Sequence, residues 1–148
     1  MSIFQLSGPL IHIGLSAFFA IILRLNIPIA VFCSILPDLV DKPLAICGIG
    51  GGRYVGHTPL FLIVVTGLFF LWNNEYGFSA LIGLMSHLIL DISGFIPWFY
   101  PFKDYKFINR TFYVNQWIKY YMNFSQFGKE LLVVCSLGII TLIYWWIY

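Results

Sequence analysis

Residues 36–58 read LPDLVDKPLAICGIGGGRYVGHT, a polar stretch rich in proline and glycine between two almost wholly apolar segments. Asp38, Asp41 and Lys42 lie between its two prolines, and Arg53 and His57 follow its run of three glycines. Ionisable groups in apolar surroundings are costly unless they are paired, and they commonly mark functional sites. The stretch therefore predicts a connection between helices that carries a functional site.

The composition is that of a membrane protein. Of the 148 residues, 60% are hydrophobic and 9% are charged, whereas a soluble domain has about 25% charged residues. A net charge of +2 is too small and too scattered to indicate nucleic-acid binding. The cysteines (Cys33, Cys47 and Cys135) form no C-x-x-C pair, so we expect neither disulfides nor a cysteine-type zinc site. We predict one integral membrane domain over residues 1–148.

The apolar runs predict an all-α bundle of four to five transmembrane helices. Proline and polar residues end each run, and the run ended by Pro37 is short enough to be a half-helix. The site-bearing core would cover residues 10–101, followed by an interfacial segment over about 98–127 and a last helix over about 129–148. The expected helices of the core are Leu10–Leu25, Ile29–Leu36, Pro59–Trp72 and Gly77–Pro97, and the last one is Glu130–Tyr148.

If these helices run alternately up and down, the histidines and most aspartates lie at one membrane face. Seven of the eight basic residues lie on that side, and Arg24 is alone on the other. The excess of positive charge predicts that the site faces the cytoplasm, in a multi-pass protein of the cell (inner) membrane. The seven are Lys42, Arg53, Lys103, Lys106, Arg110, Lys119 and Lys129.

His87 and Asp91 are spaced i, i+4, which places them on one face of a helix. They could bind a metal ion, or form a buried hydrogen bond between helices. Asp38 and Asp41 could be ligands or helix caps, and His12 and His57 could each be structural when taken singly. Together, histidine and carboxylate ligands favour a divalent metal, zinc in the first place and otherwise manganese or iron. The expected metal ligands are His12, Asp38, His57, His87 and Asp91.

Arg53 and Lys42 would complete a site for a phosphoryl group. Arginine binds two phosphate oxygens at once, whereas lysine acts as a point charge. The alternative for both is that they reach lipid headgroups at the interface. We expect Arg53, Lys42 and Asp41 as catalytic residues, the last as a ligand or a general base.

The ordered set of motifs resembles a known family. It consists of His12, Leu36-Pro37-Asp38-Leu39-Val40-Asp41-Lys42-Pro43, Gly52-Arg53, Gly56-His57-Thr58 and His87-x-x-x-Asp91. It is similar to the LexA-regulated inner-membrane type of predicted membrane-bound metal-dependent hydrolases, in an archaeal-like form. That family is distantly similar to zinc-dependent phospholipase C and P1 nuclease, which implies His87-x-x-x-Asp91 as the paired ligand motif. The later His-x-x-x-Glu of the soluble enzymes has no counterpart here.

These observations predict a membrane-bound metal-dependent hydrolase that acts on a phosphoester of a lipid or lipid-linked substrate. The same residues could instead serve a non-catalytic protein, either an ion or metal transporter or a regulatory or scaffold subunit with a degenerate site. A transport path should continue as polar residues toward the opposite face, where the sequence offers only Arg24 and Glu75. The substrate and the oligomeric state stay open.

Overall fold

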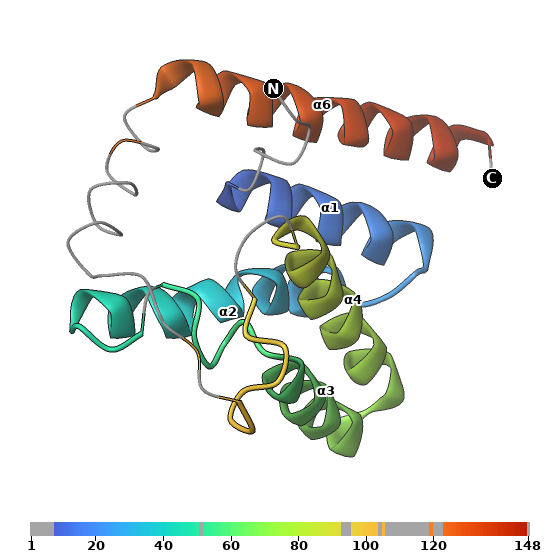
Figure 1. Cartoon of the computed structure of the whole chain (residues 1–148). Helices are drawn as coiled ribbons and strands as arrows, with labels where there is room; N and C mark the ends of the chain where they lie inside the picture. Colours follow the sequence, from blue (N-terminus) through green and yellow to red (C-terminus); the bar gives the residue numbers. More distant parts are fainter. Residues whose placement is uncertain are drawn as a thin grey trace.

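The computed structural model describes residues 8–50, 52–92, 96–103, 105, 119 and 123–147, and this part of the chain is all-α. Its helices, shown in Figure 1, are α1 (Pro9–Ile22), α2 (Ile27–Ile46), α3 (Pro59–Trp72), α4 (Asn74–Leu90) and α6 (Phe124–Ile147). No strand occurs within these ranges. Most of the interfacial segment expected over residues 98–127 falls outside the described residues.

Polar side chains at the turns set the starts of three helices. The side chain of Asn26 accepts a hydrogen bond from the backbone of Ile29 at the start of α2. Thr58 caps α3 and Asn73 caps α4 in the same way. Such caps satisfy backbone N–H groups that have no partner inside the helix. The predicted bounds of Pro59–Trp72 are confirmed, and α4 begins three residues earlier than predicted.

The prediction of a half-helix over Ile29–Leu36 is wrong. Helix α2 has 20 residues and continues through Pro37 and Pro43. A proline inside a helix removes one backbone hydrogen bond and costs about 3 kcal/mol or more. Inside a bundle, neighbouring groups can satisfy the freed backbone atoms. The missing N–H of Pro37 would have bonded to the carbonyl of Cys33, and the next carbonyl, that of Ser34, accepts a hydrogen bond from the ring of His87 on α4. Residues 37–46 are therefore helical and not a turn.

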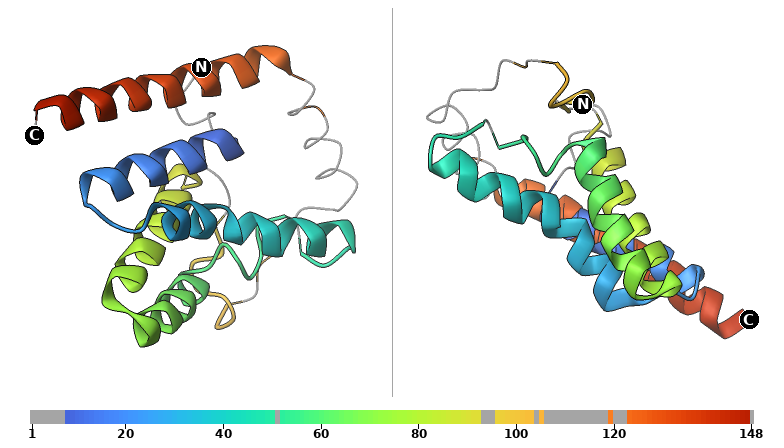
Figure 2. Two further views of the ribbon diagram at one scale, coloured as in Figure 1. Left: turned by 180° about the vertical axis from the view of Figure 1, so that it is seen from behind. Right: turned by 90° about the horizontal axis from the view of Figure 1, so that it is seen from below.

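Close contact between α2 and α4 brings the aspartates of α2 near His87 and Asp91 at the end of α4. Helix α2 packs most extensively against α4, and α3 also lies against α4. Gly83 of α4 makes this approach possible, because a Cβ there would lie 2.2 Å from the carbonyl oxygen of Ala30. The small buried core at this contact consists of Cys33, Ala80 and Leu84. Helix α6 runs along α1, outside the other helices (Figures 1 and 2).

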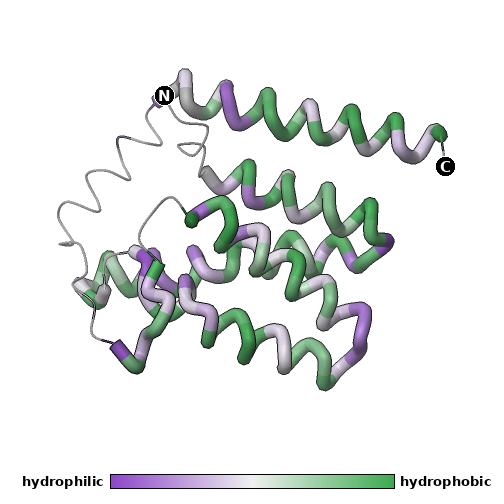
Figure 3. Tube along the Cα trace, turned by 45° about the vertical axis from the view of Figure 1, so that its right-hand side comes forward, coloured by the Kyte–Doolittle hydropathy of each residue, from purple (hydrophilic) through white to green (hydrophobic). Residues whose placement is uncertain are grey.

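Hydrophobic side chains cover the outside of the bundle. In Figure 3 the helices are mostly hydrophobic along their length, and hydrophilic residues gather in the connections. Within the described ranges, one helix is long and apolar enough to cross a membrane, over Phe127–Ile147. The apolar helices Pro9–Ile22 and Pro59–Trp72 have 14 residues each, which corresponds to about 21 Å against a hydrocarbon core of about 30 Å. The number of membrane passes stays a prediction.

Candidate metal centre

The described structure brings the five predicted metal ligands together at one end of α1 and α4. Two groups of side chains have nitrogen and oxygen atoms within 4.8 Å of one another, and His87 belongs to both. All five residues are buried except Asp38, which is partly exposed. The first group is His12, His87 and Asp91, and the second is Asp38, His57 and His87.

The separations between these atoms fit a metal centre. His57 Nε2 lies 3.1 Å from His87 Nε2 and 3.2 Å from Asp91 Oδ2. His57 Nε2 is 3.7 Å from Asp38 Oδ1, and His87 Nε2 is 3.6 Å from Asp91 Oδ2. Two ligands of a tetrahedral zinc ion lie roughly 3.4 Å apart, because each bond is about 2.0–2.2 Å long. The donor atoms are therefore spaced as ligands of one ion would be.

The hydrogen bonds at Nδ1 of His57 and His87 determine whether the Nε2 atom of each neutral ring carries a proton. His57 Nδ1 lies 2.7 Å from Asp41 Oδ2, and His87 Nδ1 lies 2.5 Å from the carbonyl oxygen of Ser34. A carboxylate and a carbonyl only accept hydrogen bonds, so both Nδ1 atoms carry the proton. In the neutral rings, both Nε2 atoms then present lone pairs to each other at 3.1 Å. A cation between them removes this repulsion.

His12 adds a further donor to the same place. Its ring stacks on that of His87 with centroids 4.1 Å apart, and its Nε2 lies 3.8 Å from Asp91 Oδ1. The side chain is almost fully buried, and its Nδ1 has no hydrogen-bond partner among the described residues. Buried polar atoms normally have a partner. The ring thus lacks the hydrogen bond at Nδ1 that a structural histidine would normally make.

The hydrogen bonds of Asp41 all run to the loop before α3, and its predicted role as a ligand or general base stays a prediction. One of its oxygens accepts hydrogen bonds from the backbone of Gly56, and the other from the backbone of Tyr54 and from the backbone and ring of His57. All four bonds hold the loop before α3, and the side chain is fully buried. Both oxygens are thus engaged with the loop and with the outer nitrogen of His57. This geometry fits a residue that orients a ligand, as carboxylates beside metal-bound histidines do.

The loop can approach α2 closely because residue 56 is glycine. A Cβ there would lie 2.7 Å from the carbonyl oxygen of Pro37 and 3.2 Å from Asp41 Cγ. The same loop contacts a later segment, since the hydroxyls of Tyr54 and Tyr100 lie 2.7 Å apart. The loop is thus held both against α2 and against the segment that contains Tyr100.

Arg53 and Lys42 lie at the edge of the cluster, each paired with an aspartate. Arg53 Nη2 is 2.8 Å from Asp91 Oδ1, and Lys42 Nζ is 2.5 Å from Asp38 Oδ2. Both cations are partly exposed. They balance the charge of one carboxylate that is partly exposed, Asp38, and of one that is buried, Asp91.

His57 attracts positive charge more strongly than an ordinary histidine. Burial acts to lower its pKa, but hydrogen bonds to Asp41 and Asp91 outweigh this effect, and the pKa of His57 is raised from its usual value. The carboxylates around the ring therefore favour a cation at this position, which is either a proton or a metal ion.

A comparison with known families adds to this geometry. The model of the YdjM inner membrane protein family matches residues 6–148, nearly the whole chain. The chain belongs to the YdjM inner membrane protein family. This match extends the predicted resemblance, which rested on residues 10–101, through α6 to the C-terminus. None of the curated proteins and none of the solved structures matches this YdjM-family chain.

Two features of the YdjM-family site were not predicted from the sequence. One is the role of Asp41, whose spacing of three from Asp38 becomes informative only when both lie on a helix. At that spacing the two side chains share a face of α2, and both can reach the loop before α3. The other is the carbonyl of Ser34, a backbone acceptor for His87 that no residue type could reveal.

Proposed function

We propose that the protein is a membrane-bound metal-dependent hydrolase that cleaves a phosphoester of a lipid or lipid-linked substrate. One observation carries the proposal: the Nε2 atoms of two buried imidazoles, those of His57 and His87, lie 3.1 Å apart beside the carboxylate of Asp91. Family membership supports a place in the inner membrane. A divalent metal, with zinc as first candidate, would supply a water of lowered pKa and a Lewis acid for a phosphoryl oxygen.

The roles of the side chains follow from where they lie. The ring nitrogens and carboxylates described above would hold the metal. Asp41 would keep His57 in the tautomer whose Nε2 is free to bind. Arg53 lies at the edge of the cluster and is partly exposed, so its guanidinium can exchange Asp91 for a phosphate oxygen. Lys42 would balance the charge of Asp38. The ligands would be His12, Asp38, His57, His87 and Asp91.

A substrate with a lipid part suits the surroundings of the site. Leu39, next to Asp38, is 54% exposed, and Ile92, next to Asp91, is 52% exposed. Apolar side chains this exposed beside buried ligands offer a surface for acyl or prenyl chains. The excess of basic residues at this end supports a site that faces the cytoplasm, in a protein that crosses the membrane several times.

A translocation path for ions is less consistent with the structure. Buried serines lie in the helices around the site, but each hydroxyl donates to a carbonyl of its own helix. Ser16 bonds to Ile13, and Ser34 bonds to Val31. These oxygens are therefore directed toward backbone atoms and do not extend the cluster through the bundle.

The proposal is tested by metal content and turnover of the full chain in mild detergent. Elemental analysis should find at least one zinc, manganese or iron ion per chain, and a synthetic lipid phosphodiester should be hydrolysed. His87→Ala and Asp91→Asn should each lose the bound metal and the turnover. Glu75→Gln is the matched control, because Glu75 is an exposed acid at the opposite end of α4. Metal content unchanged by both site substitutions would refute the metal assignment.

A further inference from the structure

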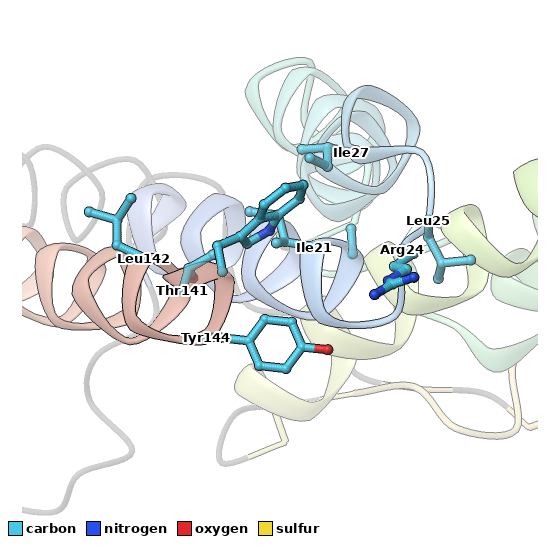
Figure 4. Close-up of a pocket in the computed structure, with 9 residues that line it drawn as sticks. Ile21, Arg24, Leu25, Ile27, Thr141, Leu142 and Tyr144 are labelled. Carbon is cyan, nitrogen blue, oxygen red and sulfur yellow. The ribbon is translucent and has the colours of Figure 1, made fainter. Parts of the chain in front are cut away.

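A cavity separates α1 from α6 at the end of the bundle away from the metal centre. It has a volume of about 830 Å³, within the range of roughly 300–1,000 Å³ that is usual for small-molecule sites. Aliphatic and aromatic side chains form most of its wall. The lining residues are Ala20, Ile21, Arg24, Leu25, Ile27, Thr141, Leu142, Tyr144 and Trp145 (Figure 4).

Helices α1 and α6 are in direct contact near their first turns. Near its start, α6 contributes Glu130, whose carboxylate accepts a hydrogen bond from the backbone of Leu10 at the start of α1. Val134 contacts Gly14 one turn further along. Beyond these contacts the helices leave the cavity between them, and Leu142 and Arg24 lie at opposite ends of it in Figure 4.

Arg24 is the one charged residue that lines this cavity. Its backbone has a φ of 54°, a left-handed conformation found at no other described residue except glycines. Hydrogen bonds from Leu25 to Ala20 and from Arg24 to Ile21 close α1 in the pattern that normally has glycine at this position. A side chain here costs conformational energy, and backbone strain of this kind is common at functional positions.

We propose that the cavity binds an anionic phospholipid, with an acyl chain between α1 and α6 and the headgroup phosphate at Arg24. The apolar wall suits the chain, and the guanidinium suits phosphate oxygens. Tyr144 and Trp145, on α6, are residue types that favour the boundary between lipid tails and headgroups. Arg24 is also the only basic residue that the sequence places at this end, so no other basic side chain competes with it for an anion.

This site is separate from the metal centre. His12 and Arg24 are 12 positions apart in the sequence, and most of this distance is helix, so they lie at opposite ends of α1, about 18 Å apart. Neither residue set contains a member of the other. The proposed lipid site therefore shares no residue with the candidate metal centre, and its test needs neither metal nor turnover.

The test measures lipid bound to the full chain in mild detergent by native mass spectrometry, with phosphatidylglycerol and phosphatidylcholine as probes. We expect phosphatidylglycerol to bind better than phosphatidylcholine. Arg24→Gln should weaken phosphatidylglycerol binding by about fivefold, the effect of one basic residue near an anionic headgroup. Lys129→Gln, which removes an exposed basic residue at the start of α6, should leave it unchanged. Leu142→Trp, which fills the cavity, should weaken binding of both lipids.

Arg24→Gly separates a binding role from a structural one. Glycine relieves the left-handed strain, so this variant should melt at a higher temperature than the wild type while it binds less phosphatidylglycerol. A variant that melts higher and binds the lipid as before would overturn the proposal. Equal binding of both lipids by the wild type would overturn the assignment of an anionic headgroup, as would equal losses in Arg24→Gln and Lys129→Gln.

Discussion

Replacing Asp41 with asparagine tests whether this residue orients a metal ligand. The carboxylate accepts four hydrogen bonds, three at Oδ2 and one at Oδ1. Asparagine can keep its oxygen at the first position, but its NH2 group then faces the backbone N–H of Gly56. One buried donor loses its partner, at a cost of about 1–3 kcal/mol. The negative charge opposite the ring of His57 is lost as well.

We therefore expect Asp41→Asn to weaken metal binding by about 10–100-fold, the usual effect of removing a partner of a metal-bound histidine. This corresponds to about 1.4–2.7 kcal/mol of binding free energy. Because the ligands themselves remain, excess metal should restore occupancy. Asp91→Asn removes a ligand, and excess metal should not restore its occupancy fully.

The assay is a competition titration of the purified full chain in detergent against a chromophoric zinc chelator. Glu75→Gln is the control for the loss of an acid at an exposed position. Circular dichroism of the metal-free variants shows whether the helices are intact. An affinity of Asp41→Asn within twofold of the wild type, with intact helices, would refute the orienting role.

Three further outcomes are expected. Removing the metal with a chelator should lower the melting temperature. A ligand present at 100 times its dissociation constant stabilises a fold by about 2.7 kcal/mol. An unchanged melting temperature would contradict a metal site that joins helices. Gly56→Ala should destabilise the protein by about 1–3 kcal/mol through overpacking, because the new Cβ would lie 2.7 Å from a carbonyl oxygen. Gly67→Ala is the control, because a Cβ at residue 67 meets open space and should not destabilise the protein. Thermal melting of the two variants measures the difference, and equal melting temperatures would contradict the close approach at Gly56. Metal affinity should fall as the pH drops below the raised pKa of His57, because Nε2 must release its proton to bind a metal. Titrations at several values between about pH 8 and pH 6 measure this affinity, and a constant affinity over that range would contradict the prediction.

The sequence predicted the helices whose ends are polar and the side chains that meet at one end of the bundle. Pro59–Trp72 was predicted to the residue, because a capping Thr58 and a proline precede it. The path of α2 could not be predicted in this way. Local propensity ends a helix at Pro37, whereas the contacts that hold α2 against α4, such as the one from His87 to the Ser34 carbonyl, form only in the folded bundle. The partners of Asp41 depend on the loop's position and were equally hidden.

Because α2 is continuous, the candidate metal centre and the fold share the same contacts. The buried apolar core consists of few and mostly small side chains, such as Cys33 and Ala80. The contacts of His87 with Ser34 and of His57 with Asp41 join α4 and the loop before α3 to the middle of α2. A metal ion between the two imidazoles would tighten both connections at once, and the free energy of binding would then contribute to folding. Substitutions of the ligands should therefore lower stability as well as metal content, whereas substitutions at the lipid cavity should leave metal content unchanged.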